Sequence, residues 1–434
     1  MATAAFYTLG CKVNQYETEA LIELFKNKGY EIVTFGEYAD VYVINTCTVT
    51  NLGDRKSRQM IRKAKKINPS SIVAVVGCYV QVAPEKVESI DEVNIIIGTD
   101  ERHRIVDLIE QYKKEQNNIS LVKDIMKVKE FEELSITELE GRTRAYLKIQ
   151  EGCNQYCSYC IIPYARGPVR SRKAKNIMNE VIKLVDNGFK EIVLTGIHVA
   201  SYGKDLEDIN LLKLLEMVHT IKGLERIRLS SIEPSIVNHE FVDTIKSLDK
   251  ICPHFHLSLQ SGCDETLRRM NRRYTTKDYK EAVELLRANI KDIAFTTDII
   301  VGFPGESEEE FNKSYQFVEE IAFSQIHVFK YSPRNGTPAA KMKSQIAPEI
   351  KEERSRKMIQ LANVLQNKFL NQQIGKTIEV LFEDELENNK GFYEGHTPNY
   401  LKVEVFSKED IRNKILPVTI EAVKNNSLIA NIKN

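Results

Sequence analysis

The sequence predicts an α/β protein of three parts: an N-terminal domain on a parallel sheet, a central partial (β/α)6 barrel and a small C-terminal antiparallel β-barrel. Short apolar runs alternate with helical patterns up to about residue 114, and again from about residue 142 to 370. After Gly375 the pattern changes to short alternating runs, which are typical of strands. A chain of 434 residues is long enough for two or three domains, each with its own core.

The first part covers residues 1–114, where βα units predict a parallel sheet. The expected strands are Ala4–Leu9, Glu31–Phe35, Val41–Asn45, Ile72–Val76 and Val93–Ile97. The expected helices are Gln15–Asn27, Asp54–Ile67 and Arg102–Lys114. Residues 115–141 are charged and weakly patterned, which indicates a linker with room for one edge strand.

The central part covers residues 142–370 and contains six strand-like runs separated by amphipathic helices. The expected strands are Ala145–Gln150, Glu191–Thr195, Arg226–Ser230, His254–Leu259, Ala294–Val301 and Gln325–Tyr331. The expected helices include Asn176–Asn187, Asn210–Ile221, Thr276–Ala288 and Glu308–Ile321. Six βα units are too few for a closed eight-stranded barrel, so we expect an open, partial one.

The C-terminal part covers residues 371–434. Its expected strands are Thr377–Phe382, Phe392–Glu394, Leu401–Val405, Leu416–Ala422 and Leu428–Ile432. Five short strands fit a small antiparallel barrel of the kind that often binds oligonucleotides. This part holds 8 Lys and Arg against 10 Asp and Glu, so its composition does not indicate a basic surface.

Charge and hydropathy narrow the class of protein. Lys and Arg number 61, as do Asp and Glu, so any attraction to nucleic acid has to come from local patches. The N-terminus lacks the pattern of a signal peptide, and no apolar stretch is long enough to span a membrane. We therefore expect a cytoplasmic protein without membrane contact, whose eight cysteines are thiols or metal ligands.

Three cysteines lie close together in the run Glu-Gly-Cys153-Asn-Gln-Tyr-Cys157-Ser-Tyr-Cys160. The spacing supplies three thiolates where a cubane iron–sulfur cluster ordinarily takes four. A cluster held this way leaves one iron open for a ligand, which is typical of a catalytic cluster. A zinc site is the alternative, but zinc sites more often combine Cys-x2-Cys with a second pair, and the sequence has none.

A second set of three cysteines follows three expected strands: Cys11, Cys47 and Cys78. The carboxyl ends of parallel strands lie at one edge of a sheet, so these thiols could meet although they are far apart in the sequence. The alternative is three independent small residues buried at strand ends. Beside the first motif, we favour a second three-ligand cluster with an open iron.

Taken together, these motifs resemble the radical S-adenosylmethionine enzymes, in particular their methylthiotransferase branch. The resemblance rests on the Cys153 to Cys160 run with the following Ile-Ile-Pro-Tyr-Ala-Arg-Gly, on Gly-Cys11-Lys-Val-Asn-Gln, and on Asn-Thr-Cys47-Thr-Val-Thr. It implies two [4Fe-4S] clusters, S-adenosylmethionine and a C-terminal TRAM domain. It further implies that S-adenosylmethionine on the first open iron yields a 5′-deoxyadenosyl radical. The second cluster would hold the sulfur to be inserted, which a second S-adenosylmethionine would methylate.

Polar residues at the barrel strand ends match the cofactor-contacting positions of that family. We expect S-adenosylmethionine to contact Thr195, Gly196, Ser230, Glu233 and Gln260, and Asp298 to act in catalysis. Each of these residues could instead belong to an ordinary strand-to-helix turn.

The resemblance offers RNA or protein substrates, and basic runs after the cysteines favour RNA. The candidate phosphate contacts are Arg55, Arg58, Arg62, Arg166, Arg170 and Arg172. A solvated basic face is the alternative for each run. The residues around Cys11 and Cys47 look like members that act on N6-threonylcarbamoyladenosine at position 37, in the tRNA anticodon stem-loop.

Other substrates and other classes of protein stay open. Related branches act on isopentenyladenosine in tRNA or on a ribosomal-protein aspartate. The substrate adenosine could also carry a cyclic form of the threonylcarbamoyl group. An enzyme of this kind would need an electron donor such as flavodoxin or ferredoxin, and a sulfur source. A protein of another class with these motifs would be a non-catalytic iron–sulfur redox sensor that binds RNA, or a zinc-stabilised RNA-binding protein.

Overall fold

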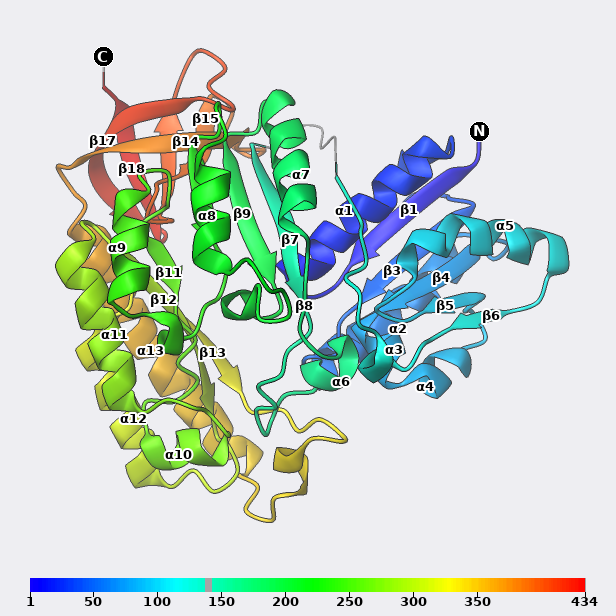
Figure 1. Cartoon of the computed structure of the whole chain (residues 1–434), viewed down its shortest axis with the longest axis horizontal. Coiled ribbons are helices and arrows are strands. Elements are labelled where there is room, and N and C mark those ends of the chain that lie inside the picture. The colour runs from blue at the N-terminus through cyan, green and yellow to red at the C-terminus, as the bar shows by residue number, and fades with distance from the viewer. Residues whose placement is uncertain (137–142, 434) are drawn as a thin grey trace.

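The computed structural model describes residues 1–136 and 143–433. The end of the expected linker, from residue 137, and the expected start of the central part at residue 142 lie outside the described residues. Three bodies follow one another along the chain, as the colours of Figure 1 show. They are a parallel α/β sheet, an arc of strands with outer helices, and a small closed β-barrel.

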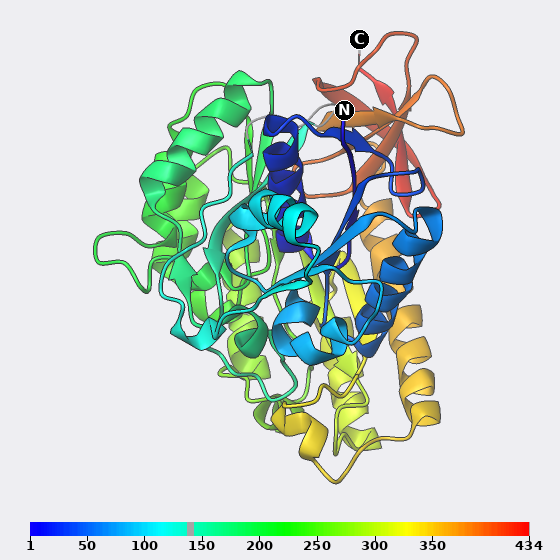
Figure 2. The same ribbon diagram turned by 90° about the vertical axis from the view of Figure 1, so that its right-hand side faces the viewer.

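The N-terminal sheet has six parallel strands in the order β2-β1-β3-β4-β5-β6. The strands are β1 Thr3–Thr8, β2 Glu31–Val33, β3 Val41–Thr46, β4 Ile72–Gly77, β5 Ile95–Ile97 and β6 Ile119–Leu121. Its helices are α1 Lys12–Asn27, α2 Asn51–Ile67, α3 Cys78–Val82, α4 Pro84–Glu88 and α5 Ile105–Glu115. The central strands β3 and β4 are buried along their whole length because helices cover both faces of the sheet (Figure 2). The edge strand β6, labelled in Figure 1, comes from the segment expected to be a linker.

The central part is an open arc of six parallel strands. Its strands are β7 Arg144–Glu151, β9 Glu191–Gly196, β10 Arg226–Leu229, β11 His254–His256, β12 Ala294–Val301 and β13 Gln325–Lys330. The bridges Ile227–Ile251 and Ile232–Leu257 join the two halves of the arc, and the short strand β8 Arg170–Ser171 adds antiparallel to β7. Its helices are α6 Ile162–Arg166, α7 Ala174–Asp186, α8 Leu211–His219, α9 His239–Ser247, α10 Asp264–Arg269, α11 Thr276–Asn289, α12 Glu308–Ile321 and α13 Pro348–Asn371. The partial (β/α)6 barrel is therefore confirmed.

The C-terminal part is a closed five-stranded barrel in the order β14-β15-β16-β18-β17. The strands are β14 Thr377–Glu385, β15 Phe392–His396, β16 Lys402–Phe406, β17 Ile415–Lys424 and β18 Ser427–Ile432. Four of the pairings are antiparallel, whereas β16 and β18 pair in parallel. A closed ring with an odd number of strands cannot alternate throughout, so one parallel pair is required.

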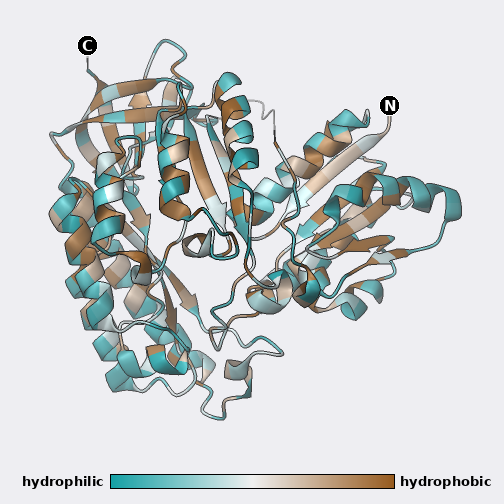
Figure 3. Cartoon of the chain, viewed as in Figure 1, coloured by the Kyte–Doolittle hydropathy of each residue, from teal (hydrophilic) through white to brown (hydrophobic). Residues whose placement is uncertain are grey.

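The other two domains pack against the central arc. The C-terminal barrel docks where the arc strands begin: the Arg226 and Arg228 guanidinium groups donate to the carbonyl oxygens of His396 and Pro398, each at 2.9 Å. On the other side, α1 lies against β7 and β9. Figure 3 shows apolar strands inside and hydrophilic outer faces on the helices. No helix among the described residues is both long and apolar enough to cross a membrane.

Candidate active site

The loop after β7 carries Cys153, Cys157 and Cys160. Gly152 precedes it with a φ of 73°, and a Cβ at this position would lie 1.8 Å from the Pro168 carbonyl oxygen, so only glycine fits there. The loop is held by backbone hydrogen bonds from Cys153 to Gly167 at 3.0 Å and from Cys160 to Cys157 at 2.9 Å. The cysteines are thus presented at the carboxyl end of β7, where barrel sites form.

The pKa values of Cys153 and Cys160 in this loop depend on burial and on the neighbouring thiol Cys157. Burial raises the pKa of Cys153 to about 11 and that of Cys160 to about 12, and a charge on Cys157 would raise both pKa values further. The Arg272 Nη1 donates to the Cys157 sulfur at 3.2 Å and supplies a positive charge beside it. Three neighbouring thiols with a cationic partner fit a metal cluster, which stabilises the thiolate form.

The second cysteine group forms at the ends of three neighbouring strands. Cys11 follows β1, Cys47 follows β3 and Cys78 follows β4. A Cβ added at Gly10 would lie only 3.2 Å from the Cys47 sulfur, so the β1 and β3 ends approach closely. Burial raises the pKa of Cys78 to about 12, and charges on Cys47 and Cys11 would raise it further. The sheet therefore brings these thiols into one neighbourhood.

No set of three His, Cys, Asp or Glu side chains in residues 1–136 and 143–433 is arranged around a single-ion site. A cubane cluster places different demands on its ligands, because each cysteine binds a different iron.

Arg166 links the two cysteine groups. It follows the Cys153 to Cys160 loop, yet its Nε donates to the Cys78 sulfur at 3.1 Å. The same fully buried guanidinium donates to Asn14 and pairs with Glu17 and Glu151. It belongs to a buried network of three cations and three carboxylates, namely Arg102, Lys148, Arg166, Glu17, Glu132 and Glu151. The network joins the N-terminal sheet to the barrel.

The burial of Arg166, Arg170 and Arg172 corrects the prediction that they contact RNA. Each is at most 2% exposed. Arg172 is bound by Glu133 at 2.7 Å and by Glu180 at 2.6 Å. Charge and spacing are the same for a surface run and for an interior one, so no sequence pattern indicates this burial.

The basic run on α2 is different, because Arg55 and Arg62 are exposed. Arg58 is half-buried and donates to the Tyr79 hydroxyl at 2.9 Å. The Arg334 Nη2 lies 2.7 Å from Asp54 and fixes the start of α2 beside the loop that follows β13. The start of α2 thus lies next to the carboxyl end of the barrel.

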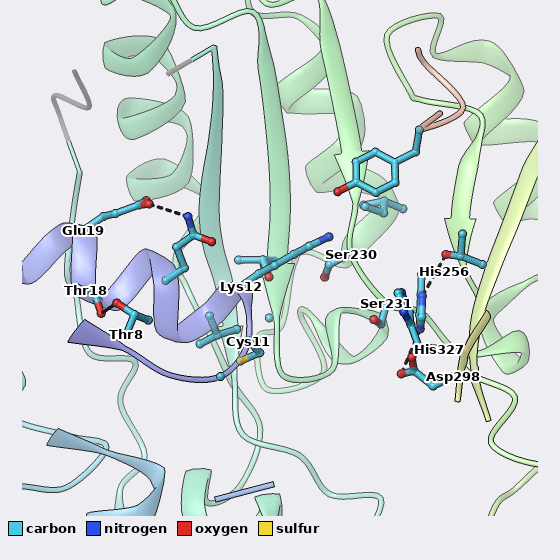
Figure 4. Close-up of a pocket in the computed structure, with 18 of the residues that line it drawn as sticks. Thr8, Cys11, Lys12, Thr18, Glu19, Ser230, Ser231, His256, Asp298 and His327 are labelled. Carbon is cyan, nitrogen blue, oxygen red and sulfur yellow. Dashed lines mark hydrogen bonds and ion pairs between the residues drawn. The ribbon is translucent and has the colours of Figure 1, made fainter. Parts of the chain in front are cut away.

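A cavity of about 990 Å³ lies where the three domains meet. Cys11 and Lys12 line it from the N-terminal domain, and Tyr400 lines it from the C-terminal barrel. The arc contributes polar side chains, which are Thr195, Ser230, Ser231, His254, His256, Thr296, Asp298, Gln325 and His327. Figure 4 shows Cys11 and Lys12 on one side of this space and His256, His327 and Asp298 on the other.

The expected cofactor residues fall into two places. Thr195, Gly196 and Ser230 line the cavity, together with Asp298, the expected catalytic residue, which lies 3.3 Å from the His256 Nε2. The other two expected residues, Glu233 and Gln260, do not line it.

Glu233 lies beside the Cys153 loop instead, between the Arg272 Nη2 at 2.9 Å and the His198 Nε2 at 3.1 Å. Burial alone would raise the pKa of Glu233, but His198 and Arg272 hold it below its usual value. Gln260 has a φ of 70° and bridges to β12 at Ile299. Sequence reasoning missed Arg272, Lys12 and Tyr400. Only Lys12 carried a signal, since it follows Cys11 directly.

Comparison with known proteins places this site in a family. Residues 147–318 match the radical SAM superfamily, and residues 3–98 match the uncharacterized protein family UPF0004. The chain is 46% identical over 423 residues to the threonylcarbamoyladenosine tRNA methylthiotransferase MtaB of Bacillus subtilis, across 97% of this chain and 94% of that protein. The chain belongs to the radical S-adenosylmethionine methylthiotransferase family.

Some relatives of this chain are named for a different tRNA nucleoside. A tRNA-2-methylthio-N(6)-dimethylallyladenosine synthase of Clostridium beijerinckii is 36% identical, across 98% of this chain and 95% of that protein. The radical S-adenosylmethionine methyltransferase TsrM of Kitasatospora setae, solved with cobalamin and a [4Fe-4S] cluster, is alike in fold. Its TM-score is 0.58 at 15% identity, across 78% of this chain and 77% of that chain.

The sequence alone left open whether the protein is an enzyme or a non-catalytic redox sensor. Its membership of this family shows that it is an enzyme. The chain is a radical S-adenosylmethionine methylthiotransferase, and its cofactors include S-adenosylmethionine and a [4Fe-4S] cluster. The thiols of the Cys153 loop are a donor set that suits this cluster.

Proposed function

We propose that this enzyme adds a methylthio group to C2 of N6-threonylcarbamoyladenosine at position 37 of tRNA. The observation that carries the proposal is the 46% identity, over nearly the whole chain, to a relative named for that substrate. The motif around Cys11, which resembles that branch, supports it because Cys11, Lys12, Val13 and Gln15 line the cavity. Residues that distinguish substrates are expected at such a wall.

In this proposal the two cysteine groups have different tasks. Cys153, Cys157 and Cys160 hold the catalytic [4Fe-4S] cluster, and a second cluster with an open iron is held by Cys11, Cys47 and Cys78. With one electron from the donor, S-adenosylmethionine at the first cluster would supply a 5′-deoxyadenosyl radical that can remove the C2 hydrogen. The second cluster would supply the sulfur that replaces this hydrogen, and a second S-adenosylmethionine would supply its methyl group.

The remaining residues position the ligands. Thr195, Gly196 and Ser230 contact S-adenosylmethionine along the carboxyl ends of the arc strands. Glu233 and Gln260 contact its ribose or its methionine part, with Glu233 held in place by Arg272 and His198. Asp298 and its neighbour His256 face the target nucleoside from the opposite wall. All three domains contribute residues to the wall of the cavity in which these ligands meet.

The proposal also names partners. The tRNA anticodon stem-loop approaches over the exposed arginines of α2, which supply phosphate contacts. An electron donor such as flavodoxin or ferredoxin reduces the catalytic cluster, and a separate source delivers the sulfur. These partners place the reaction in the cytoplasm.

Mass spectrometry of tRNA nucleosides from a strain lacking this protein tests the proposal. We expect 2-methylthio-N6-threonylcarbamoyladenosine to disappear, its unmethylthiolated precursor to accumulate, and a plasmid copy to restore the product. Unchanged levels of this nucleoside, with loss of 2-methylthio-N6-isopentenyladenosine, would assign the activity named for the Clostridium relative instead. Unchanged tRNA with loss of methylthiolation on a ribosomal-protein aspartate would assign a protein substrate.

A further inference from the structure

Lys12 places an ammonium group in the cavity, directly after Cys11. Figure 4 shows its side chain extending from the Cys11 end across the cavity. The Nζ lies 5.9 Å from the centre of the Tyr146 ring and 5.6 Å from that of Tyr400. Lys12 has no hydrogen bond and no ion pair with any described residue. Aromatic faces attract a cation only weakly, so its hydrogen-bond donors remain available for a ligand.

The arginines around Tyr400 do not line the cavity and are already bound by protein acceptors. Arg228 pairs with Glu191 at 2.7 Å, and Arg144 pairs with Glu383 at 2.8 Å. Arg226 donates to the carbonyl oxygens of His396 and Glu379. Among the described lysines and arginines, Lys12 is therefore the one that lines the cavity, and it can bind a ligand there without giving up a protein partner.

A second polar group near Lys12 also lacks a partner. His254 lines the cavity and is 4% exposed. Its Nε2 lies 3.1 Å from the Thr296 hydroxyl, whereas its Nδ1 has no hydrogen-bond partner among the described residues. The centre of the His254 ring lies 4.8 Å from that of Tyr400, the same ring that Lys12 approaches, and the two rings are tilted by 33°. An amino group without a hydrogen-bond or ion-pair partner and a buried, unpartnered ring nitrogen together indicate a site for a polar, anionic group.

We propose that Lys12 binds the carboxylate of the threonylcarbamoyl group and that His254 forms a second polar contact to this substituent. This inference rests on the proposed function and makes it more specific. An isopentenyl group has no charge, so it would leave the ammonium group unpaired inside the cavity. A site that binds a polar substrate group strongly rejects an analogue without that group, because the polar atoms of the site are then left without a partner. The cyclic form has no free carboxylate, so the linear form is the substrate.

The test measures binding of synthetic anticodon stem-loops to the reconstituted holoenzyme. One RNA carries N6-threonylcarbamoyladenosine at position 37, and the matched RNA carries the primary amide in place of the carboxylate. We expect the wild-type protein to bind the amide about tenfold to a hundredfold more weakly, the range for a charge-assisted hydrogen bond. In Lys12→Met, both RNAs should bind with the same weak affinity. Lys26→Met, an exposed lysine in the last turn of the same helix, is the control that keeps the preference.

The binding experiment distinguishes failure of the Lys12 inference from failure of the proposed function. Equal affinity of the wild-type protein for acid and amide overturns the inference, even if the variant does not fold. A preference for the acid that persists in Lys12→Met with full iron content also overturns it. The proposed function fails in a different way: the wild-type enzyme then leaves the threonylcarbamoyl stem-loop unmodified and methylthiolates the isopentenyladenosine stem-loop.

Discussion

The two cysteine groups contain the same number of thiols, and an arginine donates to one thiol in each, but they form in different ways. One group lies on a single loop after β7, at Cys153, Cys157 and Cys160. The other is assembled from the ends of β1, β3 and β4, at Cys11, Cys47 and Cys78. The loop group is defined by local spacing, whereas the strand-end group exists only when the parallel sheet has formed. Its ligand geometry should therefore depend more strongly on packing.

The arginines reflect the same difference. Arg272 donates to Cys157 from within the central domain, and its one ion-pair partner among the described residues is Glu233. Arg166 donates to Cys78 across the domain boundary, inside the network of six buried charges. Each N–H···S contact stabilises negative charge on its sulfur. Only Arg166 also holds two domains together.

The largest expected effect separates the tasks of the two groups. We expect Cys157→Ala to abolish reductive cleavage of S-adenosylmethionine, because the catalytic cluster loses a ligand. Cys47→Ala should retain cleavage and lose methylthiolation, because only the sulfur-carrying cluster is affected. Chromatographic detection of 5′-deoxyadenosine and of the modified nucleoside measures both activities.

Iron analysis provides the control for this pair. The wild-type protein should contain about eight irons per chain, and each variant about four. Cys252→Ala, a buried cysteine in neither group, should keep all eight. Full methylthiolation by Cys47→Ala would contradict a second cluster at the strand ends.

The next largest effect concerns stability. Arg166→Leu leaves Glu17 and Glu151 with one cation fewer in a fully buried network, and we expect it to cost about 3–5 kcal/mol. Arg272→Leu should cost about 1–3 kcal/mol, because Glu233 keeps His198 as a partner. Circular dichroism of thermal unfolding, under identical cluster loading, compares the two variants. An equal or smaller loss in Arg166→Leu would show that the network does not hold the domains together.

The same contrast explains what the sequence could predict. The Cys153 loop was found from its spacing, because its ligands share one short segment. The strand-end group was predicted only through the parallel sheet, since nothing local connects Cys11 with Cys78. The six-stranded arc followed from hydrophobic periodicity, which is a local property as well. The edge strand β6 was harder, because three residues at a sheet edge carry little periodic signal.

Other features depend on contacts between distant segments. Arg166 and Arg172 have the same charge and spacing as surface residues, and only their carboxylate partners make them interior. Tyr400 comes from the C-terminal barrel and lines a cavity formed mainly by other domains. The docking of three domains cannot be read from spacing in any one of them. For this reason sequence patterns could predict separate residues of the cavity, such as Thr195 and Ser230, but not that Lys12 and Tyr400 line it with them.

A smaller effect tests how tightly the strand-end group is packed. Gly10→Ala would place a methyl group 3.0 Å from the Cys47 Cβ and 3.2 Å from its sulfur. Gly29→Ala has a similar backbone strain, at a φ of 80°, but meets nothing within 4 Å. We expect both to lose about 1–3 kcal/mol, and only Gly10→Ala to lose iron from the second group. Iron content, measured beside retained cleavage of S-adenosylmethionine, distinguishes the two; equal iron loss would attribute the effect to backbone strain alone.

The smallest expected effect concerns the basic runs that follow the two groups. The α2 run keeps Arg55 and Arg62 exposed, whereas the run after Cys160 is buried. Each exposed arginine that contacts a phosphate should, on substitution by alanine, lower the slope of log affinity against log salt by about one. Arg356→Ala, an exposed arginine on α13, removes the same charge far from α2 and should leave the slope unchanged. Fluorescence anisotropy with a labelled stem-loop, between low and moderate salt, measures the slopes. If the slopes for Arg55→Ala and Arg62→Ala equal the slope for Arg356→Ala, the α2 run is a solvated face and the RNA binds to other surfaces.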